Sequence, residues 1–389
     1  MFNPRVVELP TAKELKDIAT NSGGGTSPNA MHTLMKLEGV GIKEAQIIKQ
    51  EMASAGGEAA VAGDLAEKET GILLMGTVRQ LKRAARKLSA QSFGCPGIAE
   101  EIKETLENYS KDRFTLKAGG RVRIDRPLVM GVVNVTPDSF SDGGEFFDSE
   151  IAITHAKKLV EAGADMIDIG GESSRPGSKA LPAKEELRRI VPVLDGIVDE
   201  IDVPISVDTY KPEVAKEVLE MGVRIINDIT GLKSAEMARH VADNDAGIVI
   251  MHMQGTPRTM QKRPSYDDVV SDIIRFLRER VSHAEKKGID RESIVIDPGI
   301  GFGKTWKHNL EIISRLKEFK SLGLPILVGA SRKSFIGKVL DAQVDERLSG
   351  GLAMLCMSIM NGARIVRVHD VRESVDAAKM TWAALTSSL

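Results

Sequence analysis

Short apolar runs alternate with longer amphipathic stretches from about residue 120 to the C-terminus. The runs are rich in Val, Ile, Leu and Met, which favours strands, and the amphipathic stretches have the spacing of helices. Strands that alternate with helices predict a parallel sheet whose strands are joined by crossover helices. The eight runs lie at 128–133, 165–170, 204–209, 224–229, 247–252, 294–299, 325–330 and 364–369.

Eight such units over roughly 270 residues fit a closed (β/α)8 barrel of the TIM type, whose usual size is about 250 residues. The predicted fold is therefore α/β, with a catalytic barrel over residues 119–389. A doubly wound open sheet would give the same alternation and is the competing arrangement.

Polar side chains follow nearly every apolar run. In a barrel the carboxyl ends of all strands meet on one face, so these groups would converge there. The alternative is that they cap the helices that follow. The run ends carry Asn134, Glu172, Asp208, Asn227, Asp228, His252, Asp297, Ser331, Arg332, Lys333, Arg367, His369 and Asp370.

Residues 1–118 have a different pattern. Helical periodicity extends over 31–61 and 77–91, and the run at 71–77 predicts one short strand, so we expect a small α+β appendage. The segment 37–50 resembles a helix-hairpin-helix, a module that contacts DNA backbones, but two packed helices joined by a glycine turn explain it with fewer assumptions. The glycine-rich segment 21–29 lacks the glycine-lysine pair of a P-loop, which favours an ordinary loop.

Composition and charge exclude several classes of protein. Hydrophobic residues make up 42% of the chain and charged residues 28%, which is ordinary for a globular protein. The net charge of −2 gives no field that would attract nucleic acid or an anionic membrane. The chain also lacks a signal-peptide core and an apolar run of about 18 residues. We therefore expect a cytoplasmic protein that binds neither nucleic acid nor membrane.

The motifs at the run ends resemble those of the dihydropteroate synthase family. They occur in that family's order and spacing over residues 120–389, and the segment 1–118 is similar to the N-terminal extension of its long-form members. The resemblance implies that p-aminobenzoate displaces pyrophosphate from 6-hydroxymethyl-7,8-dihydropterin pyrophosphate to give dihydropteroate. The motifs are NVTPDSFSDGG (134–144), GGESSRPG (170–177), SVDTYKP (206–212), IINDITG (225–231), MHMQGTP (251–257), DPGIGFGK (297–304), GASRKSFIG (329–337) and RVHDV (367–371).

A pterin ring presents an N–H and an amino group side by side, which one carboxylate can accept together. Asp297 is the candidate for this contact, although a carboxylate ahead of Pro298 and Gly299 could also be a turn residue. The resemblance implies that Asp208 and Asn227 bind other ring nitrogens. It also implies that Lys333 donates to the carbonyl side of the ring and takes part in catalysis.

Arg367 and His369 are two residues apart on the last predicted strand and so point to the same side, where both could bind the oxygens of a pyrophosphate. A structural role for His369 is the alternative. The resemblance implies that Asn134 contributes to a Mg2+ site at the pyrophosphate and that Ser174 adds a hydroxyl. We expect no dedicated protein cage, because Mg2+ commonly binds through substrate phosphates and keeps its waters.

An aromatic amine is neutral at pH 7, so no strong general base is expected. Its carboxylate needs an anion site, and Ser331 followed by Arg332 is predicted to open a helix whose N–H groups favour anions. The resemblance implies that Ser331 holds the carboxylate. It also implies that the ring slot is formed by Arg175, Pro176 and Phe302, with Phe140 beside them.

The loops at 135–150 and 170–183 are long for a barrel and are rich in Gly and Pro, which is typical of lids. The resemblance implies that they fold over the pterin. Asp138 and Asp142 would then lie near the charge that develops as pyrophosphate departs, and we hypothesise that they stabilise a carbocation-like pterin. Ala330 and the segment 349–351 depart from the family's common pattern beside this site.

Two other functions use some of the same residues. A pterin-dependent methyltransferase domain shares the ring-binding carboxylates but transfers no pyrophosphate, so it does not need Arg367 and His369. A noncatalytic pterin-binding protein would bind the ring and release no product. Independently of the reaction, the apolar stretch 348–360 either packs within the barrel or forms the face of a homodimer, as the resemblance implies.

Overall fold

The chain consists of two compact units, residues 1–110 with 386–389, and residues 111–385. Their architecture comes from a computed structural model, which describes residues 32–62, 68–136, 145–173, 177–178 and 180–387. The boundary expected near residue 118 lies within a hairpin of the second unit, formed by β4 (Phe114–Lys117) and β5 (Arg121–Ile124).

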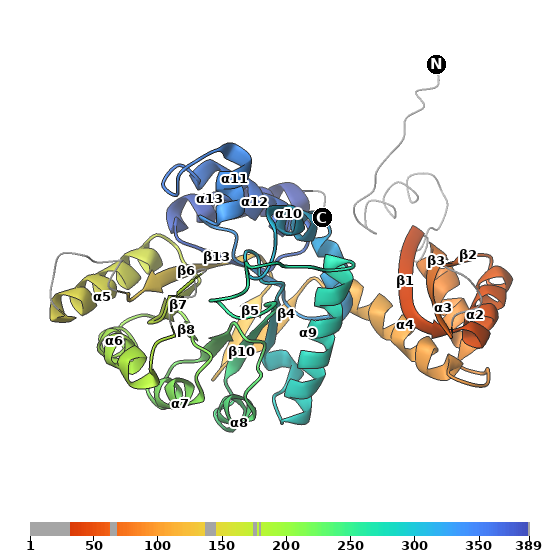
Figure 1. Cartoon of the computed structure of the whole chain (residues 1–389), viewed down its shortest axis with the longest axis horizontal. Helices are drawn as coiled ribbons and strands as arrows, with labels where there is room; N and C mark the ends of the chain where they lie inside the picture. Colours follow the sequence, from red (N-terminus) through yellow and green to blue (C-terminus); the bar gives the residue numbers. More distant parts are fainter. Residues whose placement is uncertain (1–31, 63–67, 137–144, 174–176, 179, 388–389) are drawn as a thin grey trace, which may run out of the picture. The chain divides into compact units, whose positions relative to one another are not determined.

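The first unit is an α+β fold built on a three-stranded antiparallel sheet of order β1-β3-β2 (Figure 1). Ile48, Met52, Leu74 and Leu81 are wholly buried in its core. Its elements are β1 (His32–Gly41), α2 (Ile42–Ser54), β2 (Glu58–Val61), β3 (Glu69–Thr77), α3 (Val78–Leu88) and α4 (Cys95–Tyr109).

Two expectations for the first unit are wrong. Residues 32–41 form a strand and not a helix, because β1 pairs with β3 in a long antiparallel ladder that outweighs local periodicity. The segment 37–50 is therefore a strand followed by a helix. The two helices of a helix-hairpin-helix are not present there, and the helix α2 begins only after Gly41.

The second unit contains eight parallel strands around a barrel (Figure 1). Neighbouring strands are hydrogen-bonded in the order β11-β10-β9-β8-β7-β6-β13-β12, and a parallel bridge between Ile296 and Ile326 joins the two ends. This closure confirms the barrel and rejects the open sheet. The strands are β6 (Leu128–Asn134), β7 (Met166–Gly170), β8 (Ile205–Asp208), β9 (Ile225–Asp228), β10 (Gly247–Met251), β11 (Ile294–Asp297), β12 (Leu327–Val328) and β13 (Ile365–Val368).

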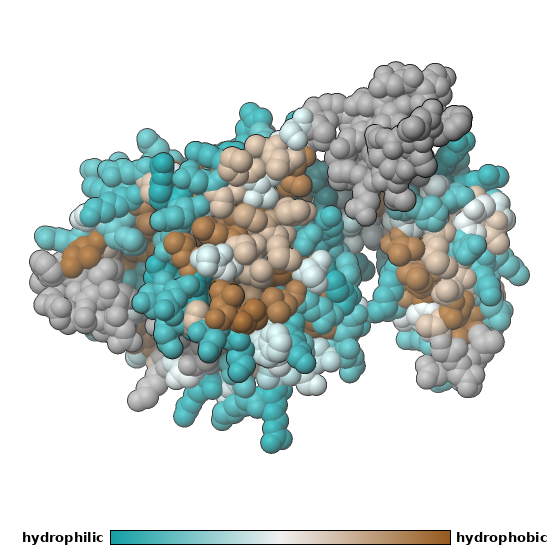
Figure 2. All heavy atoms as spheres, turned by 90° about the horizontal axis from the view of Figure 1, so that it is seen from above, coloured by the Kyte–Doolittle hydropathy of each residue, from teal (hydrophilic) through white to brown (hydrophobic). Residues whose placement is uncertain are grey.

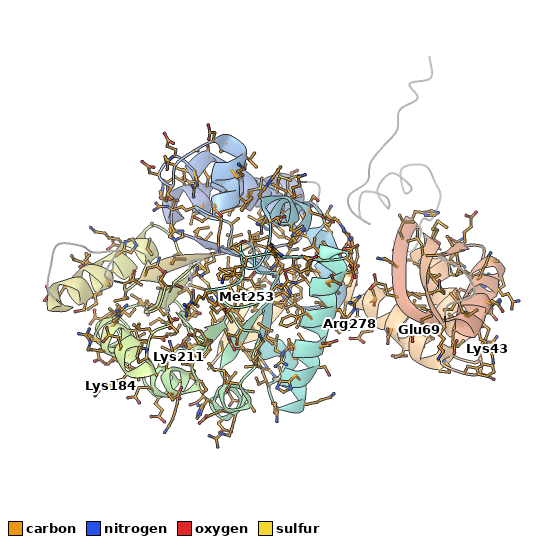
Figure 3. All side chains as sticks on the ribbon, in the orientation of Figure 1. Lys43, Glu69, Lys184, Lys211, Met253 and Arg278 are labelled. Carbon is orange, nitrogen blue, oxygen red and sulfur yellow. The ribbon has the colours of Figure 1, made fainter. Side chains whose placement is uncertain are left out.

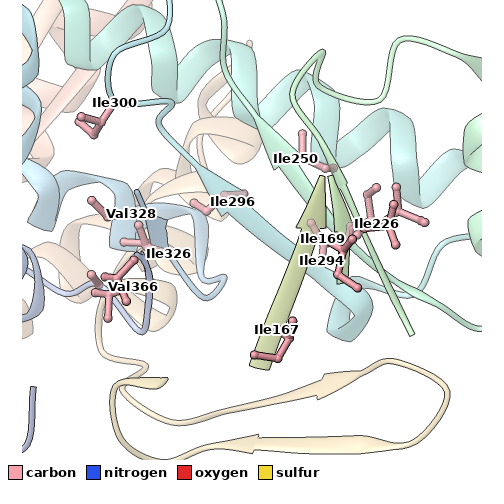
Figure 4. Packing of buried hydrophobic residues seen from close by; sticks show 14 of the residues in the cluster. Ile167, Ile169, Ile226, Ile250, Ile294, Ile296, Ile300, Ile326, Val328 and Val366 are labelled. Atoms are coloured by element: carbon pink, nitrogen blue, oxygen red, sulfur yellow. The ribbon is translucent and has the colours of Figure 1, made fainter. Parts of the chain in front are cut away.

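Helices surround the strands on the outside. Their apolar faces meet outward-pointing Ile and Val side chains, of which Ile167, Ile226 and Ile250 are labelled in Figure 4. No helix in the described part of the chain is long and apolar enough to cross a membrane. The helices are α5 (Glu145–Glu161), α6 (Ala183–Asp195), α7 (Pro212–Glu220), α8 (Ala235–Asp243), α9 (Val269–Lys286), α10 (Trp306–Ser314), α11 (Ser334–Leu340), α12 (Leu348–Met360) and α13 (Val371–Thr386), with short 3-10 segments at Arg291–Ser293 and Leu316–Leu322.

The interior of the barrel is apolar at its amino-terminal end. The hairpin β4–β5 contributes Leu116 and Ile124 to a cluster with Met130 of β6 and Met166 of β7, all wholly buried. Water is therefore excluded from this end. Polar side chains in the barrel interior can reach substrate only from the carboxyl ends of the strands.

The loop after β11 approaches the loop after β10 so closely that only glycine fits at one position. Gly299 has φ +71°, and a Cβ built on it would lie 2.0 Å from the carbonyl oxygen of His252. Both the backbone conformation and the contact exclude a side chain there. Asp297 and Phe302 are held on either side of this crossing point.

We predict that Gly299→Ala destabilises the second unit by more than about 2 kcal/mol, because it adds a strained φ and a backbone clash. Gly351→Ala is the matched control. Gly351 lies in α12, and a Cβ built on it would meet no atom within 4 Å, so the change should be neutral or stabilise by up to about 1 kcal/mol. Urea unfolding followed by tryptophan fluorescence reports this unit, which contains both Trp306 and Trp382. Equal midpoints for the two variants would contradict the prediction.

Candidate active site

A layer of polar side chains lies above the apolar interior, at the carboxyl ends of the strands. Its members point inward because they alternate with outward-facing apolar residues along each strand. Asp208 of β8 and Asn227 of β9 are register partners, and Asp168 of β7 pairs with Ser206 two residues below Asp208. Arg367 enters the same layer from β13.

Arg367 is paired with two carboxylates in this layer. Its Nε donates to Asp168 Oδ2 at 2.6 Å, and its Nη2 donates to Asp208 Oδ2 at 3.0 Å. Asp168 is wholly buried, and the side chain of Asp208 is 12% exposed. Burial raises the pKa of Asp208 to about 7. The guanidinium is thereby held in one plane across the barrel.

Asp297 and Asn227 are the other buried groups expected to bind the ring. Asp297 Oδ1 accepts from the backbone N–H of Gly299 at 2.7 Å, and burial raises the pKa of Asp297 to about 6. Asn227 Nδ2 donates to Asp168 Oδ2 at 3.2 Å, while its Oδ1 is buried without a protein partner in the described part of the chain. Both side chains therefore retain oxygens that can accept hydrogen bonds from a ligand.

Lys333 lies close to the loop after β11. Its Nζ is 4.2 Å from the centroid of the Phe302 ring, and a Cβ on Gly301 would lie 3.0 Å from its Cδ. Burial lowers the pKa of Lys333 to about 8, with Arg367 adding to the effect. The ammonium and the aromatic ring thus lie together, beside the carboxylate of Asp297, whose pKa Lys333 lowers.

One wall of the site is apolar. Phe302 packs in a small cluster with methionine and isoleucine side chains from the end of β10 and from the loops after β9 and β10, and Tyr210 packs against it. Met253, one of these residues, is labelled in Figure 3. A flat ring can rest on such a wall while its edges meet the polar layer. The cluster consists of Ile229, Met251, Met253, Met260 and Phe302.

Ser331 and His369 lie side by side. The hydroxyl of Ser331 is 3.1 Å from His369 Nδ1 and accepts from the backbone N–H of His369 at 3.3 Å. Burial lowers the pKa of His369 to about 3, with the nearby cations Arg367 and Arg332 adding to the effect. The imidazole is therefore neutral near pH 7 and acts as a hydrogen-bonding group without a positive charge.

The expectation that Ser331 opens a helix is wrong. The helix α11 begins at Ser334, with Lys333 as its N-cap residue. Arg332 has φ +57°, which is incompatible with a helix, and its guanidinium pairs with Asp370 through two hydrogen bonds. Any anion at Ser331 would consequently meet side chains in a turn and not the end of a helix.

Asn134 ends β6 next to this layer, since its Oδ1 would lie 3.8 Å from a Cβ on Gly170 and Asp208 Cβ would lie 3.7 Å from it. The described residues contain no cluster of three His, Cys, Asp or Glu side chains that could hold a metal. Five of the expected site residues and Phe140 lie outside the described residues. The five are Asp138, Asp142, Ser174, Arg175 and Pro176.

Sequence reasoning missed Asp168. A single carboxylate within an otherwise apolar strand, MIDIG, was the available signal. It also missed Lys304, which is 2% exposed and donates to the carbonyl oxygens of Phe302 (2.8 Å) and His252 (3.3 Å). Burial lowers the pKa of Lys304 to about 7. This lysine ties the loop after β11 to the loop after β10.

A buried ion cluster joins the loops after β7 and β8. Lys211, labelled in Figure 3, donates to both Glu172 and Glu186, and the hydroxyl of Tyr210 donates to Glu172 at 3.0 Å. Glu186 of α6 is wholly buried. The cluster ties Glu172, just after β7, to α6 and to the loop after β8.

Three comparisons agree on the family. The family model described as "Pterin binding enzyme" matches residues 130–369. The dihydropteroate synthase of Escherichia coli (strain K12) is 46% identical over 269 residues, which are 69% of this chain and 95% of that protein. A crystal structure of Xanthomonas albilineans dihydropteroate synthase with 4-aminobenzoic acid is 43% identical with a TM-score of 0.67, covering 70% of this chain and 99% of that one.

A longer relative also matches part of the first unit. A probable bifunctional folylpolyglutamate synthase/dihydropteroate synthase of Haloferax volcanii is 40% identical over 354 residues, or 88% of this chain and 42% of that protein. With the barrel closed, its polar layer assembled and these similarities in agreement, the chain belongs to the pterin-binding enzyme family, as a dihydropteroate synthase with an N-terminal extension.

Proposed function

We propose that the polar layer of the barrel binds 6-hydroxymethyl-7,8-dihydropterin pyrophosphate and that the site joins it to p-aminobenzoate. In this reaction an N–C bond forms, the C–O bond to pyrophosphate breaks, and the amine proton leaves to solvent. The observation that carries the proposal is the convergence of Asp208, Asn227, Asp297 and Arg367 in one layer above an apolar floor.

The ring is held by groups of matching hydrogen-bonding character. Ionised Asp297 accepts the adjacent N–H and amino groups of the pterin, and Asn227 and Asp208 accept or donate at the opposite edge. Lys333 donates toward the ring carbonyl from beside Phe302. Because these groups are buried, their hydrogen bonds to the ring are not weakened by bulk water.

The pyrophosphate lies toward Arg367 and His369. Arg367 provides the positive charge, and neutral His369 provides a hydrogen-bonding ring nitrogen. Asn134 has the hard amide oxygen that suits Mg2+, an ion that commonly binds through substrate phosphates and keeps its waters. When bound, Mg2+ supplies further positive charge to the leaving group.

The amine slot is formed on the side of Ser331 and Phe302. The hydroxyl of Ser331 hydrogen-bonds the p-aminobenzoate carboxylate, and Phe302, together with Arg175 and Pro176 of the loop after β7, surrounds the benzene ring. For Asp138, Asp142 and Ser174, which lie outside the described residues, we propose roles at the departing pyrophosphate. This arrangement aligns the amine nitrogen with the methylene carbon, and positioning supplies much of the rate.

The rival functions differ at the pyrophosphate end. A methyltransferase or a noncatalytic pterin-binding protein needs Asp297 and Asn227 to bind the ring. Neither function needs the guanidinium of Arg367 near Asn134, because neither one displaces a pyrophosphate. The position of Arg367 between two carboxylates, within the layer that binds the ring, favours pyrophosphate displacement.

We predict that the purified chain releases pyrophosphate and forms dihydropteroate only when dihydropterin pyrophosphate, p-aminobenzoate and Mg2+ are all present, with the product identified by mass. Asp297→Asn should lower kcat/KM by at least about 100-fold, because two charge-assisted hydrogen bonds are lost. Asp290→Asn is the control, since Asp290 is exposed and pairs with Lys117 at the opposite end of the barrel. Ring binding without amine-dependent release would instead support the noncatalytic alternative.

We also propose that the chain forms a homodimer through its second unit. Apolar side chains gather on the face of α11, α12 and α13 (Figure 2). Exposed groups of this kind mark interaction surfaces when they are contiguous. The large apolar residues exposed on these helices and on the loop between the first two are Val339, Leu340, Val344, Leu348, Met357, Met360 and Met380.

Light scattering coupled to size-exclusion chromatography should give twice the chain mass of 42.2 kDa. The double change Met357→Lys and Met360→Lys should convert the dimer to a monomer, because it places charges in the apolar face. Leu34→Lys is the control, since Leu34 is 67% exposed in the first unit. A wild-type monomer, or a dimer that survives the double change, would refute this interface.

A further inference from the structure

Asp168 is the one carboxylate of the polar layer for which the proposed reaction has no use so far. It is wholly buried, and a single oxygen, Oδ2, accepts from both Arg367 Nε at 2.6 Å and Asn227 Nδ2 at 3.2 Å. These two donors belong to residues expected to bind different parts of the same substrate. Asp168 therefore contacts the machinery for the ring and for the pyrophosphate at once.

The strand register places Asp168 at the inner side of the polar layer, below the level of Asp208. Asp168 pairs with Ser206, whereas Asn227 pairs with Asp208, which is two residues closer to the carboxyl end of the same strand. The hydrogen bond from Asn227 to Asp168 consequently crosses β8 between Ser206 and Asp208. Asp208 thus lies closer to the open, carboxyl end of the barrel than the hydrogen bond between Asp168 and Asn227. Asp168 lies closer to the apolar interior.

The shared oxygen restricts how both donors can turn. Arg367 is held at Nε by Asp168 and at Nη2 by Asp208, so the plane of its guanidinium is fixed and its Nη1 is not used by either bond. The amide of Asn227 is held at Nδ2, which leaves its Oδ1 without a protein partner in the described site. Rotation of the amide would place Oδ1 against the carboxylate of Asp168, where two acceptors would repel.

We propose that Asp168 is a positioning residue, which fixes Asn227 with its amide oxygen toward the pterin ring and Arg367 with its guanidinium plane toward the pyrophosphate. The inference rests on the proposed function, because it assigns Asp168 a role in binding that substrate. It acts through Asn227 and Arg367 and does not itself touch the ring or the pyrophosphate.

A role as a plain countercharge explains the geometry less well. Arg367 already has the carboxylate of Asp208 as a partner. Asn227 is neutral and needs no countercharge, yet it donates to the same oxygen. Burying a second carboxylate in the barrel costs desolvation free energy, so its retention suggests a role beyond neutralising Arg367. The orientation of two substrate-binding groups is such a role.

The test is steady-state kinetics of Asp168→Asn beside the wild type, with both substrates varied. The isosteric amide keeps the volume but carries no charge, so its one oxygen accepts more weakly from the two donors, and its –NH2 group can take the place of either carboxylate oxygen. We expect kcat/KM for dihydropterin pyrophosphate to fall by about 100-fold or more. Loss of one supporting contact of this kind typically lowers affinity or activity by 10- to 100-fold, and here two substrate-binding residues lose theirs. The KM for p-aminobenzoate, measured at saturating pterin substrate, should change less than threefold.

The matched control is Ser206→Ala. Ser206 is also wholly buried, is the register partner of Asp168, and its hydroxyl makes no hydrogen bond in the described structure. Its removal should leave both KM values and kcat within about threefold. Asp168→Glu keeps the charge and serves as a second variant, and the positioning role predicts that it remains defective because the acceptor is displaced by one methylene.

Non-additivity gives an independent readout. Because Asp168 acts partly through Asn227, Asp168→Asn combined with Asn227→Ala should cost clearly less than the sum of the two single effects. Strict additivity, an equal loss for both substrates, or full activity in Asp168→Glu would overturn the proposal. It would also be overturned if neither Asp168 variant folds by circular dichroism, since the residue then serves stability.

A wild type without product would refute the proposed function itself, and an active wild type with an active Asp168→Asn would refute only this inference.

Discussion

The pairing of Arg367 with two buried carboxylates is the interaction on which the candidate site depends. A guanidinium inside a barrel is stable only if its charge and donors are matched, and removing one partner of such a pair typically costs about 3–5 kcal/mol. Asp168 and Asp208 supply that match from β7 and β8 while Arg367 comes from β13. Because β13 is hydrogen-bonded to β6, β6 to β7 and β7 to β8, the order of the strands in the curved sheet brings these residues together.

The rest of the second unit can be understood as support for this layer. The hairpin β4–β5 and the apolar side chains around Met130 seal the amino-terminal end, so the charges face substrate and not water. Gly299 allows the loops after β10 and β11 to cross, and Lys304 ties them by donating to two carbonyl oxygens. Asp297, Phe302 and Lys333 are thereby held on the same side of the barrel mouth, where a flat ring can rest against an apolar wall while its edge meets polar groups.

The sequence predicted the barrel well because eight buried strands with polar ends leave a regular signal. It predicted the strand of residues 32–41 wrongly, since pairing with β3 is a contact that periodicity does not contain. It placed a helix start at Ser331, whereas the positive φ of Arg332 delays the helix to Ser334. It passed over Asp168 because one carboxylate in an apolar strand has no partner visible in the sequence. The roles of Asp138, Asp142 and Ser174 stay predictions, as these residues lie outside the described part of the chain.

Recognition of the ring by an ionised Asp297 is tested most directly by the pH dependence of 6-hydroxymethylpterin binding, measured by calorimetry between pH 5 and 8. Burial raises the pKa of Asp297 to about 6, so the carboxylate that accepts the ring N–H groups is charged above that pH and becomes protonated below it. Affinity should therefore fall as the pH drops through about 6, approaching tenfold per unit. Asp297→Asn should lose this fall and keep only the change near pH 7 that comes from Asp208. An affinity that stays constant or increases toward pH 5 in the wild type would contradict recognition of the ring by an ionised Asp297.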